Sequence, residues 1–250
     1  MNYNWNWGIF WEPSPEGVGT YLDMLLSGLR WTLATALCAW LIALVFGSAV
    51  GVMRTLPGRA AQVVGNAYVE FFRNIPLLVQ LFLWFFVLPE LLPPSWGIWM
   101  KQMPNAPFWT AVVGIGLYMS ARVAEQVRAG VNALSKGQGM AGTALGLTTA
   151  QVYRYVLLPM AFRIILPPLT SEFLNIIKNS SVALTIGLLE LTGRARAMQE
   201  LTFKVFEAFA AATVIYLLTN LVVVLLMRVL ERRLRVPGFI GSATQSTGGH

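Results

Sequence analysis

The sequence has little charge and almost none of the residues that form disulfides or bind metals. Of its 250 residues 12% are charged and 56% are apolar, which excludes an ordinary soluble domain and indicates an integral membrane protein. Its single cysteine, Cys38, lies in an apolar run and cannot form a disulfide within one chain. Its single histidine is His250, so the sequence holds no histidine and cysteine cluster with metal-ligand spacing. We therefore expect neither a metal site nor a cofactor.

Sequence motifs for nucleotide binding and catalysis are also absent. The chain has no G-x-x-x-x-G-K-[ST] segment with which to hold nucleotide phosphates. It has no His/Asp pair and no nucleophile elbow. We therefore expect no catalysis in this chain and no nucleic-acid partner, and any process that uses ATP would depend on a partner protein.

Five apolar stretches are present instead, and they predict the fold. At about 1.5 Å rise per residue, the first is long enough to cross a hydrocarbon core of roughly 30 Å. The sequence therefore predicts an all-α integral membrane protein of about five transmembrane helices, in a single domain over residues 1–250. The expected spans are residues 31–53, 75–92, 108–127, 164–189 and 206–230.

The basic residues predict how these spans are oriented. The basic residues in or bordering the segments that follow the first, third and fifth spans are Arg54, Arg59, Arg73, Arg122, Arg128, Lys136, Arg154, Arg163, Arg228, Arg232, Arg233 and Arg235. The other long loop contains only Lys101, so the positive-inside rule predicts that the N-terminus lies outside and the C-terminus in the cytoplasm. Arg194, Arg196 and Lys204 conflict with this topology, because they fall in an outer loop; either they line a pore mouth or the fourth span ends elsewhere.

The two ends of the chain are predicted from composition. The start, MNYNWNWGIFWEPSPEG, has no basic region and contains Glu12 and Glu16, so it does not resemble a cleavable signal peptide. Residues 1–29 are therefore expected to form a periplasmic or interfacial segment. Residues 238–250 are predicted to form a disordered cytoplasmic tail.

Residues 140–159, MAGTALGLTTAQVYRYVLLP, interrupt the apolar pattern. Gly146 is followed by Thr148 and Gln151, which form a T-x-x-Q capping box for a new helix. The segment thus predicts a short helix rich in small residues, a glycine stop and a second helix, before Pro159 marks the return to the bilayer. Such a hairpin could face the cytoplasm, or it could be an amphipathic helix lying on lipid.

The spacing of this segment resembles the EAA loop of bacterial ABC-importer permeases, whose pattern is E-A-A, three residues, G, nine residues and I-x-L-P. The chain differs from it at Met140 for Glu, Gly142 for the second Ala and Val156 for Ile. The resemblance implies a coupling helix that docks in a cleft of the ATPase. The residues expected to couple to the ATPase are Met140, Ala141, Gly142, Thr143, Ala144, Gly146, Leu158 and Pro159.

Further segments narrow the family. Residues 68–82 (YVEFFRNIPLLVQLF) and 175–187 (NIIKNSSVALTIG) resemble polar amino-acid permeases. The segments NWNWGIF, PELLP, RYVLLPMAFRIILPPLTSE and ERRLRVP resemble the glutamate/aspartate branch of that family in Gram-negative bacteria. This resemblance implies an inner-membrane permease subunit that imports acidic amino acids by alternating access. It also implies the partners: a second, related permease, two cytoplasmic ATPases that bind the ATP, a periplasmic amino-acid-binding protein and membrane lipid.

Two other functions remain open. The chain could be a permease of the same family for another polar amino acid, such as glutamine, histidine or arginine. It could also be a channel or carrier that acts alone, although no second half resembles the first, as the inverted repeats of many such carriers would require.

The fourth span carries a polar face. At 100° per residue its polar and charged side chains fall within an arc of about 120°, and charges at membrane depth are costly unless they face protein or water. The face predicts the wall of a translocation pathway or a contact between permeases. The alternative is a structural network in which Glu172 and Lys178 find partners on neighbouring helices. The candidate pathway residues are Ser171, Glu172, Asn175, Lys178 and Asn179.

Overall fold

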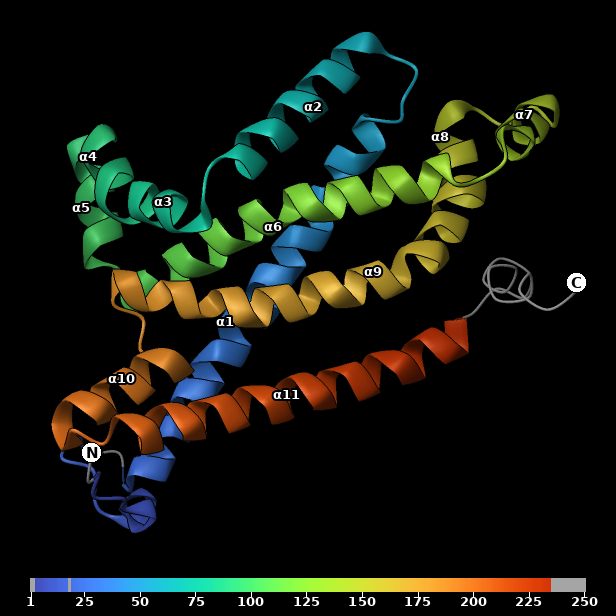
Figure 1. Ribbon diagram of the computed structural model, residues 1–250. Helices are drawn as coiled ribbons and strands as arrows, with labels where there is room; N and C mark the ends of the chain where they lie inside the picture. The colour runs from blue at the N-terminus through green and yellow to red at the C-terminus, as the bar shows by residue number, and fades with distance from the viewer. Residues whose placement is uncertain (1–2, 18, 235–250) are drawn as a thin grey trace, which may run out of the picture.

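The computed structural model describes residues 3–17 and 19–234, whose regular structure is helical apart from one isolated bridge between Pro13 and Thr20 (Figure 1). The predicted all-α fold is confirmed, and the predicted tail, 238–250, lies outside the described residues. The α-helices are α1 (Tyr21–Met53), α2 (Arg59–Asn74), α3 (Leu77–Phe82), α4 (Leu88–Leu91), α5 (Pro94–Gln102), α6 (Ala106–Asn132), α7 (Lys136–Ala144), α8 (Thr149–Val152), α9 (Leu158–Asn179), α10 (Leu191–Thr202) and α11 (Val205–Leu234). Two π-helical turns, η2 (Leu83–Val87) and η3 (Tyr153–Leu157), and two 3-10 helices, η1 (Trp7–Trp11) and η4 (Ser180–Ile186), complete the order.

Helices α1, α6 and α9 form the core, with α1 crossing the other two (Figure 1). Small residues let α1 and α6 approach closely. A Cβ atom added at Gly47 would lie 2.6 Å from the carbonyl oxygen of Ser120, and one added at Gly116 would lie 2.8 Å from the side chain of Ile42. The central helix α6 is therefore buried by its neighbours along much of its length, and Val123, Ala124 and Val127 are fully buried.

A sharp bend separates α2 from α3, and its cause lies in the sequence. A proline disfavours helical backbone in the residue before it, and Ile75, before Pro76, is extended with φ −103° and ψ 126°. The two helical segments meet at 98°. The buried Gln80 stabilises the bend, because its side-chain nitrogen donates to the carbonyls of Phe72 and Ile75, both at 2.8 Å. The predicted second span, 75–92, therefore begins at a bend.

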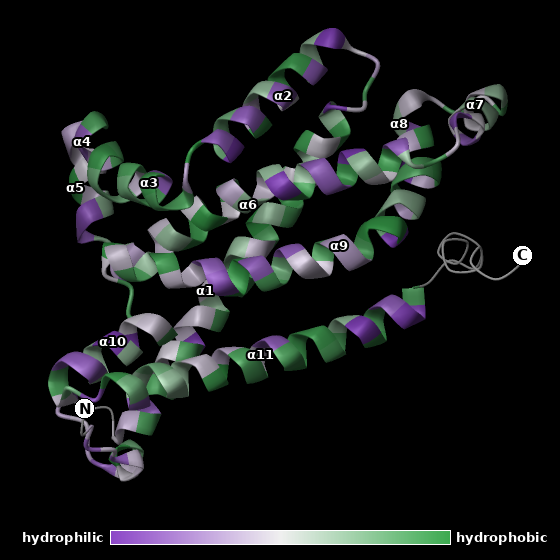
Figure 2. Cartoon of the chain, viewed as in Figure 1, coloured by the Kyte–Doolittle hydropathy of each residue, from purple (hydrophilic) through white to green (hydrophobic). Residues whose placement is uncertain are grey.

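By length and composition, three helical segments of the described chain could cross a membrane: Tyr21–Met53, Thr149–Ile186 and Val205–Leu234. A fourth is possible if α2 and the segment Leu77–Leu91 form one broken span. Figure 2 shows hydrophobic residues along most of α11. The predicted third span lies in α6, which is not among these segments, so the number of five stays a prediction.

Candidate functional site

Helices α7 and α8 form a hairpin, residues 136–152, at the opposite end of the molecule from α10 (Figure 1). After α7 the chain turns at Gly146, whose φ of 82° suits a residue without a Cβ atom. The amide of Gly146 donates to the carbonyl of Thr143 at 3.0 Å, and the amide of Leu147 donates to Gly142 at 3.1 Å. This pair of bonds is a Schellman motif, which ends a helix at a glycine.

The second helix begins at the capping box that the sequence predicts. The backbone amide of Thr148 donates to the side chain of Gln151 at 2.8 Å, and the Gln151 amide donates back to the Thr148 hydroxyl at 3.4 Å. The chain then passes through the π-helical turn η3 into α9 without a break. Local sequence alone therefore specifies the shape of the hairpin.

The hairpin presents most of its surface to its surroundings. Met140 is 66% exposed and Leu145 is 83% exposed, which is unusual for large apolar side chains. Gly142, in contrast, is buried against Val152 of α8, and a Cβ atom there would lie 3.0 Å from a methyl group of that valine. A pocket of about 630 Å³ opens between the hairpin and the end of α6, with Met140, Thr143 and Tyr153 among its lining residues.

The residues predicted to couple to an ATPase fall into two groups. Met140, Ala141, Thr143, Ala144 and Gly146 are exposed on the hairpin, while Gly142 is buried within it. Leu158 and Pro159 lie at the start of α9, where Leu158 packs against the buried cluster of Val131, Leu134 and Ala161. The hairpin therefore continues through η3 into α9, whose first residues pack against the end of α6.

The predicted polar face of the fourth span lies on α9 and its side chains point in more than one direction. Glu172 is buried and lies 3.8 Å from the guanidinium of Arg122 on α6, and the Asn175 amide donates to it at 3.4 Å. Asn179 is half-buried, with its amide nitrogen 3.6 Å from the sulfur of Met119. Ser171 and Lys178 are exposed. Glu172 therefore has the partner on a neighbouring helix that a structural network requires, whereas Ser171 and Lys178 face away from the core.

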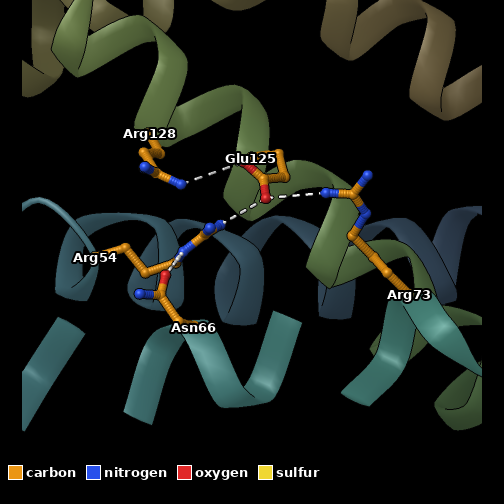
Figure 3. A network of polar contacts seen from close by, with 5 residues as sticks. All are labelled: Arg54, Asn66, Arg73, Glu125 and Arg128. Carbon is orange, nitrogen blue, oxygen red and sulfur yellow. Dashed lines mark hydrogen bonds and ion pairs between the residues drawn. The ribbon is translucent and has the colours of Figure 1, made fainter. Parts of the chain in front are cut away.

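A second charged cluster joins α1, α2 and α6. Figure 3 shows Arg54, Arg73 and Arg128 directed toward the single carboxylate of Glu125. Arg54 and Arg73 each lie 3.0 Å from one of its oxygens, and Arg128 lies 4.0 Å from the other. The terminal nitrogen of Arg54 is not aligned for a hydrogen bond, so its contact is an ion pair, while its Nε donates to Asn66 at 2.7 Å. Glu125 thus holds three helices together.

Buried carboxylates stabilise the α10 end of the molecule, which comprises residues 3–17, α10 and the start of α11. Glu190 is fully buried and caps α10, accepting hydrogen bonds from the amides of Thr192 and Gly193 at 2.9 and 2.8 Å. The hydroxyls of Tyr216 and Thr32 also donate to it, at 2.9 and 3.4 Å. Burial raises the pKa of the Glu190 carboxyl, although these hydrogen bonds oppose the shift.

The basic residues that conflict with the predicted topology all have local partners. Arg194 pairs with Glu16, Arg196 pairs with Glu200 at 2.8 Å, and the Lys204 ammonium donates to the carbonyl of Asn4. Their positive charge is therefore balanced or bound within the α10 end.

Sequence reasoning missed two features of these sites. The i, i+3, i+6 spacing of Arg122, Glu125 and Arg128 is compatible with ion pairs along one helix surface, but Arg54 and Arg73 approach Glu125 from segments distant in the sequence. The second feature is Glu190, which caps α10 although glutamate is not among the residues that helix N-caps favour, so local sequence gives little signal for it.

Comparison with known proteins gives a consistent picture. Residues 23–236 match the family described as binding-protein-dependent transport system inner membrane component. The glutamate/aspartate import permease protein GltJ of Escherichia coli is 46% identical over 244 residues, covering 96% of this chain and 99% of that protein. A probable glutamine ABC transporter permease protein of Bacillus subtilis, GlnM, is 35% identical over 212 residues, covering 85% and 94%.

Solved structures agree on the fold. A chain in the crystal structure of an amino acid ABC transporter with histidines has a TM-score of 0.73 and 33% identity, and the match covers 85% of this chain and 95% of that one. The inward-facing MetNI methionine ABC transporter has a TM-score of 0.72 at 20% identity, which shows similarity of fold alone.

Proposed function

The chain belongs to the family of binding-protein-dependent transport system inner membrane components, and from this premise we propose that it imports glutamate and aspartate as the permease subunit of an ABC importer. The assignment of the substrate rests on the 46% identity to a glutamate/aspartate import permease over almost the full length of both chains. The family implies a partner ATPase, a second permease and a binding protein. We propose that the second permease is a related chain and that the binding protein is periplasmic.

The hairpin is the proposed docking element for the ATPase. Its exposed apolar side chains, Met140 and Leu145, would be unusual on a free surface and suit a partner's cleft. Met140 stands where the EAA pattern has a glutamate, so this contact would depend on apolar packing instead of charge. In this proposal the hairpin faces the cytoplasm, the N-terminus lies in the periplasm, and Met140, Ala141, Thr143, Ala144 and Gly146 touch the ATPase.

The polar face of α9 is the proposed wall of the translocation pathway. Ser171 and Lys178 are exposed in the single chain, and Asn175 and Asn179 are half-buried beside them. Polar groups at membrane depth are expensive in lipid, so this face should border a second permease or a water-filled pathway. Glu172, held by Arg122, would position the face and would not itself bind the substrate.

An uptake experiment tests the substrate. Labelled glutamate is supplied to cells with and without the gene, in competition with unlabelled aspartate, glutamine and arginine. We expect deletion to abolish the saturable uptake and aspartate to compete best. Competition by glutamine alone would favour glutamine as the substrate, which the 35% identity to a probable glutamine permease makes the second candidate.

A hairpin variant tests the coupling to an ATPase. Ala141→Asp and Ala144→Asp each place a charge on the exposed surface of α7, where neither changes a buried contact. We expect both variants to insert in the membrane in normal amount but to lose co-purification with the ATPase. Normal co-purification of both would contradict the assignment of the hairpin.

A further inference from the structure

The side chain of Tyr153 connects two parts of the molecule that are far apart in the sequence. Tyr153 begins η3, immediately after the hairpin. Its ring packs in the cluster formed by the end of α6 and the start of α9, which includes Val131 and Leu134. Its hydroxyl donates a hydrogen bond of 2.7 Å to the backbone carbonyl of Thr55, which follows the end of α1.

The acceptor of this bond lies in the α1–α2 elbow, residues 54–58. Thr55 lies in the turn just after the C-cap of α1, where a backbone carbonyl has no helical partner, so a side-chain donor satisfies a group that would otherwise need water. Across residues 3–17 and 19–234, no other hydrogen bond joins the hairpin or η3 to α1 or α2. The Tyr153 hydroxyl is thus the specific polar link between them.

The elbow is itself fixed to the helices around it. Arg54 donates to Asn66 of α2 at 2.7 Å and pairs with Glu125 of α6 at 3.0 Å, as Figure 3 shows. The side chain of Gln62 donates to the carbonyl of Leu56 at 2.7 Å. A displacement applied to the elbow would therefore move α2, and with it the bend that leads into α3.

We propose that Tyr153 is a further coupling residue, whose hydrogen bond to Thr55 transmits displacement of the hairpin to the α1–α2 elbow. The inference rests on the proposed function. The backbone already joins the hairpin to α6 through residues 133–135 and to α9 through η3. The hydroxyl of Tyr153 adds a third connection, to the α1–α2 elbow. A displacement of the hairpin would therefore reach α1 and α2 as well as α6 and α9.

The test removes only the hydroxyl. Tyr153→Phe keeps the ring in its cluster, and the full complex with its ATPases, second permease and binding protein is reconstituted in vesicles. We expect labelled glutamate imported per ATP hydrolysed to fall by about two- to tenfold, the factor that one hydrogen bond of typical strength controls. Tyr155→Phe is the matched control, because Tyr155 lies in the same turn, its ring is exposed, and its hydroxyl has no hydrogen-bond partner among the described residues. It should leave the ratio unchanged.

A second readout separates coupling from simple stabilisation. Hydrogen exchange of the amides in residues 54–58 is measured in the complex with and without ATP. We expect ATP to change their protection in the wild-type protein and in Tyr155→Phe, but not in Tyr153→Phe. The inference would be overturned if Tyr153→Phe imported as much glutamate per ATP hydrolysed as the wild-type protein. It would also be overturned if ATP still changed the amide protection of residues 54–58 in Tyr153→Phe. The proposed function would stand in both cases.

Two other outcomes would also count against the inference. Loss of the ATPase from the Tyr153→Phe complex would overturn it, because the residue would then act in assembly. Failure of the wild-type complex to import glutamate, aspartate or glutamine would overturn the proposed function and this inference together.

Discussion

The hairpin end and the α10 end of this molecule are held by different interactions. The hairpin closes on itself through backbone hydrogen bonds, a capping box and the contact of Gly142 with Val152, and its outer surface is exposed. The α10 end is held by two fully buried carboxylates, Glu190 and Glu207, which accept hydrogen bonds from other segments of the chain.

This difference in contacts determines which end of the molecule can move. Glu207 accepts from the Tyr3 hydroxyl and, at 2.8 Å, from the amide of Asn6, so residues 3–17 are fastened to the start of α11. Opening these contacts would leave buried carboxylates without partners, at a cost far above that of moving an exposed hairpin. The hairpin end should therefore open or shift locally, whereas the α10 end should open only as the whole protein unfolds.

The largest expected effect comes from removing the buried carboxylate of the α10 end. Glu190→Ala leaves two backbone amides and two hydroxyls without their acceptor, and we expect the free energy of unfolding to fall by at least about 3 kcal/mol. Thermal unfolding in detergent measures this. Glu200→Ala, which removes an exposed carboxylate from the same helix, should change it by less than about 0.5 kcal/mol. Similar losses in the two variants would contradict the role of burial.

Crowding the hairpin should have a smaller and local effect. Gly142→Leu forces a side chain against Val152, and overpacking of this kind costs about 1–3 kcal/mol. We expect faster hydrogen exchange of the hairpin amides and weaker ATPase binding, with little change in overall melting. Gly137→Leu is the control, since its nearest neighbour would be a hydroxyl at 3.8 Å. If both variants behaved alike, the packing of Gly142 would not explain the effect.

A capping box is present at each end of the molecule, so the same threonine-to-alanine substitution can be compared at the α10 end and in the hairpin. Thr20 caps α1 near the α10 end with Asp23, and Thr148 caps α8 with Gln151. Replacing either threonine by alanine should cost about 1 kcal/mol. We expect Thr20→Ala to lower the melting temperature of the whole protein and Thr148→Ala to speed exchange only in the hairpin. Global destabilisation by Thr148→Ala would show that the hairpin does not open independently.

The smallest expected effect is a dependence on pH. Because burial raises the pKa of Glu190, the folded protein holds this proton more tightly than the unfolded chain does. The stability that this carboxyl contributes is therefore fully present below its ordinary pKa, about 4.5, and is lost as the pH rises through the raised value. We expect the melting-temperature difference between wild type and Glu190→Gln to shrink as the pH rises above about 4.5. A constant difference would contradict the shift.

Much of the architecture could be predicted from local sequence. The glycine stop at Gly146 and the capping box of Thr148 depend on a few adjacent residues, and both are present in the structure. The helical segment Leu77–Leu91 nearly coincides with the predicted span 75–92, but the 98° bend before it was not predicted, because it depends on the Gln80 side chain as well as on Pro76. The polar face of α9 was predicted from periodicity, but periodicity cannot show that Arg122 on another helix would pair with Glu172.

The sequence by itself determined the membrane class, the all-α fold and the shape of the hairpin, because apolar length, helix capping and glycine conformation act over a few neighbouring residues. The tertiary structure alone decided which charges meet. Glu125 gathers arginines from three helices, Glu190 binds groups from α1, α10 and α11, and Tyr153 reaches a carbonyl 98 residues earlier. Such contacts depend on how the helices pack, since no local pattern specifies which side chains that packing brings within hydrogen-bonding distance.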